Sequence, residues 1–148
     1  EGQVWYNTTS NALKGFKLLA TGSWATVNSM NTARYAAAAA SAIGTASIVF
    51  GGAVGPSSTD TVNTETWNGT NWTEVNNLNT GRFQLAAAGT NTAALGFGGS
   101  NLALTELWNG TNWTEVNDLN SARSRLGGAG WTISININFF RNRNLEWN

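Results

Sequence analysis

The chain has 148 residues with eight basic and eight acidic side chains, and it contains neither cysteine nor histidine. Because the charges are balanced and scattered and no apolar run approaches the roughly 20 residues that span a bilayer, we expect no nucleic-acid partner and no membrane insertion. The missing thiols and imidazoles exclude disulfides and remove the commonest metal ligand and general base, so we expect neither a cofactor nor an enzyme.

The remaining composition is typical of a turn-rich, all-β protein. The sequence has 17 glycines, 8 tryptophans and 21 asparagines, and charged residues make up 11% of it. Glycine and asparagine favour tight turns, and aromatic residues favour strands.

Residues 1–21 predict an N-terminal hairpin. QVWYN (3–7) and ALKGFKL (12–18) are strand-like runs on either side of the turn TTSN (8–11). A two-stranded hairpin is only marginally stable alone. We therefore expect it to pack against another surface and to serve attachment or trimerisation.

A repeat occupies residues 22–130. TETWNGTNWTEVNNLNT (64–80) returns as TELWNGTNWTEVNDLNS (105–121) with fourteen of seventeen positions identical, and SWATVNSMNTAR (23–34) is an earlier, weaker copy. The offsets are 48 and 41 residues. The longer offset contains the insertion AVGPSSTD (53–60), which predicts a lengthened surface loop. If the protein binds a ligand, the best candidates are SNLAL (100–104) and the loop residues Pro56, Ser57, Ser58, Thr59 and Asp60.

Each unit of about 41 residues predicts four short strands, which is the pattern of a propeller blade. In one unit the strands fall in 83–89, 93–99, 104–108 and 113–116, with an Asn-Gly turn between the last two. The alanine-rich run 34–42 has the composition of a helix. It aligns with 82–90 and with the glycine-containing 123–131, so we interpret it as an inner strand.

The pattern stops at Trp131. Residues 131–140 alternate apolar and polar side chains, which predicts a divergent C-terminal strand, and 141–148 form a docking tail or a frayed end. About 2.5 blades cannot close a ring of four to eight. Either three chains complete a six-bladed ring, or the tail strand caps an open array, or the sequence is a fragment. We favour completion by oligomerisation, because cyclic homo-oligomers are common.

The repeated side chains allow a functional and a structural interpretation. The arginines form a ring for an anionic sugar or partner, or they pair with the repeated glutamates or stack on tryptophan faces. The tryptophans are sugar platforms, or they are core between sheets. Repetition once per unit favours the structural interpretation of both. Four acidic residues recur at repeat positions, namely Glu65, Glu74, Glu106 and Glu115. A catalytic acid/base pair would therefore have to come from the other four, Glu1, Asp60, Asp118 and Glu146.

Residues 22–130 resemble kelch repeats. SIVFGG (47–52) and ALGFGG (94–99) end in a double glycine, followed by an aromatic residue and then by a second tryptophan. The resemblance implies an all-β fold of four-stranded propeller blades. The structural repeat positions are Trp24, Arg34, Gly51, Gly52, Trp67, Asn68, Gly69, Trp72, Arg82, Gly98, Gly99, Trp108, Asn109, Gly110, Trp113 and Arg123.

The start, EGQVWYNTTSNALKGFKLL, resembles a short hairpin of bacteriophage tail-fibre and related virion proteins. This resemblance implies a virion location and a structural or adhesive role in assembly and host attachment. The implied partners are copies of the same chain, with a trimer favoured, other virion proteins, and a host surface glycan or receptor. The alternative is a carbohydrate-binding propeller module of a microbial surface protein.

Overall fold

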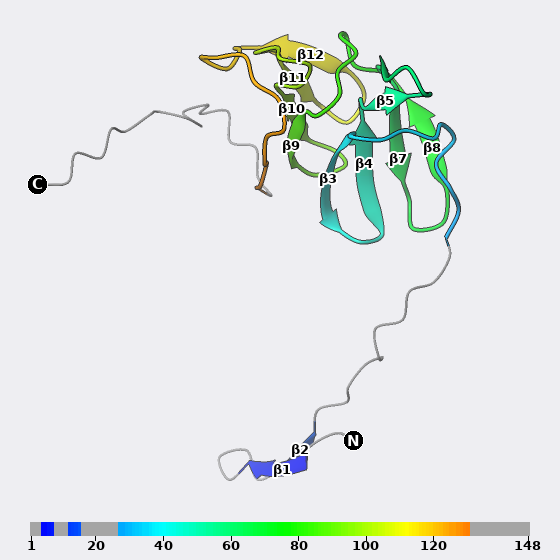
Figure 1. Ribbon diagram of the computed structural model, residues 1–148. Coiled ribbons are helices and arrows are strands. Elements are labelled where there is room, and N and C mark those ends of the chain that lie inside the picture. Colours follow the sequence, from blue (N-terminus) through cyan, green and yellow to red (C-terminus); the bar gives the residue numbers. More distant parts are fainter. Residues whose placement is uncertain (1–3, 8–11, 16–26, 131–148) are drawn as a thin grey trace, which may run out of the picture.

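The computed structural model describes residues 4–7, 12–15 and 27–130, and every regular element in these residues is a β-strand (Figure 1). The strands form two four-stranded sheets and two two-stranded sheets, and all pairs are antiparallel. The prediction of an all-β fold is confirmed. In this part of the chain there is no helix that meets the length and hydropathy needed to cross a bilayer.

The N-terminal hairpin consists of β1 (Val4–Asn7) and β2 (Ala12–Gly15). Val4 pairs with Gly15 and Asn7 with Ala12, so the two strand-like runs are paired, as the sequence predicts.

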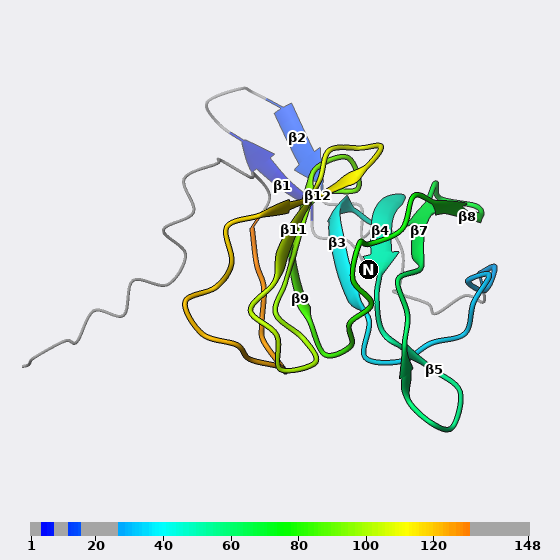
Figure 2. The same ribbon diagram turned by 90° about the horizontal axis from the view of Figure 1, so that it is seen from above.

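The first sheet has the strand order β3-β4-β7-β8, with β3 at Ala38–Ile43, β4 at Ala46–Phe50, β7 at Thr64–Trp67 and β8 at Trp72–Val75. The alanine-rich run is therefore a strand, as its alignment predicts. Small side chains suit this position because β3 lies beside the inner strand of the second sheet (Figure 2).

The second sheet has the order β9-β10-β11-β12, with β9 at Ala86–Gly89, β10 at Ala94–Phe97, β11 at Thr105–Trp108 and β12 at Trp113–Val116. Its register repeats that of the first sheet. Glu106 pairs with Glu115 and Trp108 with Trp113, as Glu65 pairs with Glu74 and Trp67 with Trp72. Both sheets are thus built from the same meander, as the repeat predicts.

The insertion after the first double glycine is more ordered than a plain surface loop. It forms the short strands β5 (Ala53–Val54) and β6 (Thr59–Asp60). Residues 55–60 are exposed, but Ala53 is fully buried and exchanges two backbone hydrogen bonds with Tyr35, of 3.0 and 2.9 Å. The sequence analysis placed Ala53 in the surface insertion, although it continues the apolar run that precedes the turn.

The core lies between the two sheets. The face of the first sheet that carries Ala38, Ala40, Ile48 and Phe50 packs against the second sheet, and we call it the junction face. Phe50 meets the Trp113 ring edge-on, with the ring centroids 4.6 Å apart. Gly96 lies under Phe50: a Cβ at Gly96 would be 2.6 Å from a carbon of that ring. The second sheet therefore approaches closely only because this position has no side chain.

The double glycines link one unit to the next. Gly52 and Gly99 have φ of +100° and +90°, and their N–H groups donate to the carbonyls of Arg82 and Arg123, at 2.8 and 2.9 Å. The left-handed conformation favours glycine here. A side chain is also excluded by space, because a Cβ at Gly52 would lie 2.8 Å from the carbonyl oxygen of Tyr35.

Three predictions fall outside the described residues. They concern Trp24, the strand expected in 131–140 and the tail 141–148.

Candidate assembly site

Two of the three repeated arginines form buried ion pairs with repeated glutamates. Arg34 binds Glu65, and Arg82 binds Glu106 at 2.8 Å; all four side chains are at most 2% exposed. The predicted pairing is therefore found for these two arginines. Glu74 and Glu115 instead lie exposed on β8 and β12.

Burial lowers the pKa of Arg82 from its ordinary value, and the adjacent Glu106 carboxylate raises it in turn. The same two causes, in the same order, act on the pKa of Arg34 through Glu65. The buried guanidinium of Arg82 is tolerated because its donors are satisfied, whereas Arg34 Nε has no hydrogen-bond partner among the described residues. In addition to Glu106, Arg82 donates to the carbonyls of Leu104 and Gly98, at 2.6 and 3.0 Å. The Glu65 and Glu106 carboxylates are therefore engaged in structural bonds.

Each arginine ends a seven-residue segment that bridges two structural units. We call residues 28–34, 76–82 and 117–123 the first, second and third arginine segments. The second begins after β8 of the first sheet and binds forward onto the second sheet. Asn76 donates to Thr111 O and Asn112 Oδ1, at 2.9 and 2.8 Å, and the backbone and side-chain amides of Asn79 donate to Glu106, at 2.8 and 2.9 Å.

The first arginine segment makes equivalent bonds to the first sheet. Asn28 donates to Thr70 O and Asn71 Oδ1, at 2.9 and 2.7 Å, and the Asn31 N–H donates to Glu65 at 2.7 Å. The Asn-Gly turns present these acceptors. Asn68 and Asn109 each accept two backbone N–H groups, at 2.8–2.9 Å, while Gly69 and Gly110 have φ near +94° and +93°.

The third arginine segment binds the sheet that precedes it in the sequence, through the same bonds as the second arginine segment. Asp118 accepts the Thr105 N–H at 3.2 Å, as Asn77 accepts that of Thr64 at 3.0 Å. Leu119 N–H donates to Ala103 O at 2.9 Å, as Leu78 N–H donates to Val62 O at 3.0 Å. This segment is thus fixed on the second sheet as the second segment is fixed on the first.

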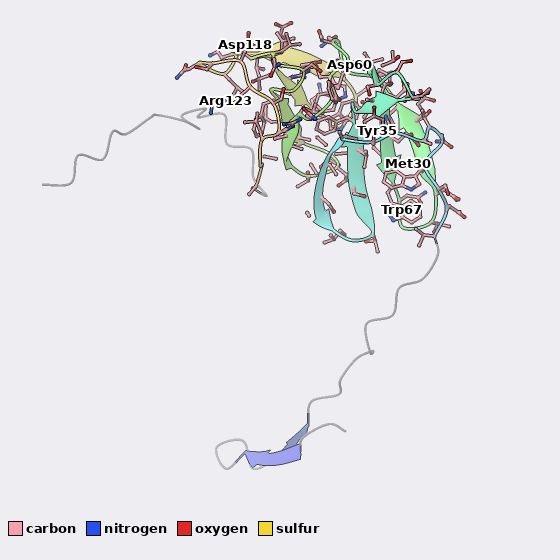
Figure 3. The ribbon with its side chains drawn as sticks, viewed as in Figure 1. Met30, Tyr35, Asp60, Trp67, Asp118 and Arg123 are labelled. Atoms are coloured by element: carbon pink, nitrogen blue, oxygen red, sulfur yellow. The ribbon has the colours of Figure 1, made fainter. Side chains whose placement is uncertain are left out.

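In the described part of the chain, the third arginine segment makes no bonds to a following sheet, unlike the first and second segments. Arg123 is exposed and has no carboxylate partner within residues 27–130, whereas the side chains of Arg34 and Arg82 are fully buried. Asn117 and Asn120 donate no side-chain hydrogen bond among the described residues, whereas their counterparts Asn76 and Asn79, which are equally exposed, donate to the second sheet. Figure 3 labels Asp118 and Arg123 on the side of the second sheet away from the first. Sequence reasoning grouped the three arginines and missed this asymmetry.

The four paired tryptophans are packing residues to different degrees. Trp108 and Trp113 are 1% and 6% exposed, Trp67 is 9% exposed and Trp72 is half-buried. The ring centroids are 5.4 Å apart in the first of these pairs and 5.3 Å apart in the second. Trp113 Nε1 donates to Thr64 Oγ1 at 3.2 Å across the junction. The core interpretation fits the second sheet best, because its tryptophans are covered by the first sheet.

A shallow polar cavity of about 390 Å³ lies beside the variable loops. Ser100 and Asn101 come from the loop 100–104 that the sequence singled out, and Ser100 Oγ donates to Asp60 of the insertion at 2.6 Å. Sequence reasoning missed its other lining residues, although they vary between otherwise matched repeats. The cavity is lined by Phe83, Gln84, Ser100, Asn101, Ser124 and Arg125.

The backbone around this cavity is held in the left-handed region. Gln84 and Arg125 have φ of +56° and +58°, but Ala36 at the same repeat position has +51°, so this conformation belongs to the junction. Arg125 N–H donates to Gln84 O at 2.9 Å and Gln84 N–H to Ala36 O at 2.8 Å.

The loop 56–60 is exposed, and Tyr35 Oη donates to Ser58 Oγ at its tip. Groups of three or more acidic, histidine or cysteine residues able to hold a metal ion do not occur in the described residues. A scan of the sequence against protein-family models finds no matching family, and a search of curated proteins finds no relative.

Proposed function

We propose that this protein is a structural and adhesive component of a bacteriophage virion, in a tail fibre or similar appendage, built from kelch-like blades. Its N-terminal segment associates with copies of the same chain, with a trimer favoured, and with other virion proteins. Its blades present a surface rich in amides and hydroxyls to neighbouring subunits and to a glycan or receptor on the host.

The observation that supports assembly with a partner protein is the third arginine segment. It is anchored on the second sheet like its counterpart, and Arg123 faces outward where Arg82 is buried. Unsatisfied repeat faces invite association. The virion location is supported by the resemblance of residues 1–19, whose hairpin pairs β1 with β2.

Native mass spectrometry of the full chain tests the assembly role, and a trimer is the expected species. Gold-labelled antibodies against the protein test the location, and labelling should concentrate on the appendages of the phage particle. A protein that stays monomeric at micromolar concentration, or labelling confined to infected cells, contradicts the proposal.

The alternative, a carbohydrate-binding propeller module, is favoured by the cavity beside the variable loops. It offers an aromatic ring, amides, hydroxyls and the guanidinium of Arg125, which are the groups that orient a sugar. Glycan-array binding that is lost in Arg125→Ala and kept in Trp72→Ala would support this cavity as the site. Loss in Trp72→Ala alone, with the fold intact, would instead favour the tryptophan platform.

A further inference from the structure

We propose that the outer face of the second sheet is an acceptor for one more repeat unit of the same kind as the second sheet, supplied by a partner. The unit must carry a glutamate at the position of Glu106, a tryptophan at that of Trp113 and a glycine at that of Gly96. This inference deepens the proposed assembly role and rests on it.

The outer face of the second sheet copies the junction face of the first. Leu95 and Phe97 stand where Ile48 and Phe50 stand, and they pack with Leu107 and Val116 in a separate apolar cluster. Ile48 and Phe50 are fully buried under the second sheet, whereas Leu95 and Phe97 are each 8% exposed. Leu119 and Leu126 cover part of this cluster and are half-buried, although their counterparts Leu78 and Leu85 are buried.

A buried hydroxyl points to the missing donor. Thr105 is 3% exposed, and its Oγ1 has no hydrogen-bond partner among the described residues. The equivalent Thr64 Oγ1 accepts the indole N–H of Trp113 from the next sheet. A buried polar atom without a partner is uncommon. A tryptophan from a further unit therefore fits the place left beside Thr105.

The positive charge of Arg123 at the same edge favours a partner with a carboxylate. Arg123 is oriented by its backbone, because its N–H donates to Leu102 O at 3.2 Å and its carbonyl accepts the Gly99 N–H at 2.9 Å. The Arg82 carbonyl makes the equivalent bond to Gly52 while its side chain reaches Glu106. Asn117, at the position of Asn76, would then bind the Thr-Asn turn of the incoming hairpin, as Asn76 binds Thr111 and Asn112.

The first sheet of a second copy is a poor occupant. Val49 faces Glu65 in the register position where Gly96 faces Glu106, so its side chain would enter the space that a phenylalanine ring fills at the existing junction. In addition, Glu65 and Asn71 are already bound by the first arginine segment of their own chain. A second copy can therefore dock in this way only by giving up contacts that it already has.

A synthetic peptide tests this assignment with the full chain. Its sequence is that of residues 93–117, which contain β10, β11 and β12. We expect saturable binding by NMR, with shifts at Thr105 and at the Arg123 side chain. Peptides that carry Glu106→Gln, Trp113→Phe or Gly96→Val should each bind about tenfold more weakly or worse. Charge reversal, with Arg123→Glu in the protein and Glu106→Arg in the peptide, should recover binding lost by either change alone.

The absence of cysteine allows a second measurement. Because Asn76 and Asn112 are in contact at the existing junction, Asn117→Cys protein should form a disulfide with an Asn112→Cys peptide faster than Ser57→Cys protein does. No binding of the unchanged peptide, equal binding of the Gly96→Val peptide, or equal disulfide rates would overturn the proposal.

A mixture of Asn117→Cys and Asn71→Cys full chains tests a second copy as occupant. Disulfide dimers between them would overturn the choice of partner, and their absence is expected. The outcome is separable from the virion proposal. Loss of the trimer with intact peptide binding would refute the proposed function alone, and intact trimer without peptide binding would refute this inference alone.

Discussion

The two buried arginines show how a repeated charge becomes part of the packing. Arg82 satisfies Glu106 and two backbone carbonyls at once, so the guanidinium stabilises the crossing between sheets although burial disfavours its charge. Removing one partner of a buried pair leaves the other charge uncompensated.

Arg82→Ala should therefore lower the free energy of unfolding by about 3–5 kcal/mol, measured by urea denaturation. Arg123→Ala is the matched control, because this side chain is exposed and lacks an acidic partner in the described residues. It should change the stability by about 0.5 kcal/mol or less. Equal losses in the two variants would contradict the difference between the second and third arginine segments.

Gly96 is a second residue whose role is set by space. Gly96→Ala places a methyl group 2.6 Å from a carbon of Phe50, and overpacking of this kind should destabilise the protein by about 1–3 kcal/mol. Gly44→Ala is the control, because its Cβ would meet nothing within 4 Å. Thermal unfolding of both variants measures the difference, and an unchanged melting temperature for Gly96→Ala would argue against close contact of the sheets.

At this scale the sequence predicted partners better than it predicted environments. Arginine and glutamate recur at fixed offsets, so their pairing was open to prediction. The exposure of Arg123 could not be predicted, because it depends on which sheet follows the segment in space. Locally, NSAR (120–123) is similar to NTGR (79–82). The unpartnered hydroxyl of Thr105 has no local signal either, since Thr64 occupies the same motif.

At the scale of elements, β8 and β12 have the same sequence, WTEV, and different surroundings. Trp113 of β12 faces the first sheet and donates across the junction to Thr64, whereas Trp72 of β8 is half-buried on the far side of the first sheet. Figure 3 labels Met30 and Trp67 on that same outer side. We therefore expect these identical strands to contribute differently to stability.

Trp113→Phe should cost about 1–3 kcal/mol, because it leaves the buried Thr64 hydroxyl without its donor. Trp72→Phe, at the equivalent position, should cost about 1 kcal/mol or less. Chemical denaturation of both variants provides the comparison. A larger loss for Trp72→Phe would mean that the outer side of the first sheet is covered as well as the junction is.

The strands themselves were predicted well, and for one physical reason. Alanine favours a helix locally, but β3 lies beside β9, and the small side chains of Ala38 and Ala40 are buried there. Aligning the repeats carried this tertiary information, which composition alone does not. The insertion was predicted less well, because the burial of Ala53 depends on its backbone pairing with Tyr35, which is distant from it in the sequence.

At the scale of the molecule, the two four-stranded sheets share one core. The main apolar cluster combines Ile48 and Phe50 of the first sheet with Trp108 and Trp113 of the second. Repeat proteins are stabilised by the contacts between neighbouring units as well as within them. The two sheets should therefore unfold together.

Phe50→Leu tests this coupling and should lower stability by about 1–3 kcal/mol. Urea unfolding followed by NMR at the Ile48 and Leu95 amides should give one midpoint for both sheets, shifted equally by the substitution. Separate midpoints, or a shift confined to the first sheet, would show that the units fold independently.

The third arginine segment has a consequence for how such a molecule would grow. Each added unit of this type buries the arginine of the unit before it and displays a fresh arginine of its own. Each junction therefore creates the same acceptor again, and nothing in its contacts limits the number of units. Unit number must be set by something outside it, either curvature that brings the last face onto the first or a terminal unit that lacks the arginine. A single substitution at the position of Arg123 would then prevent the addition of a further unit.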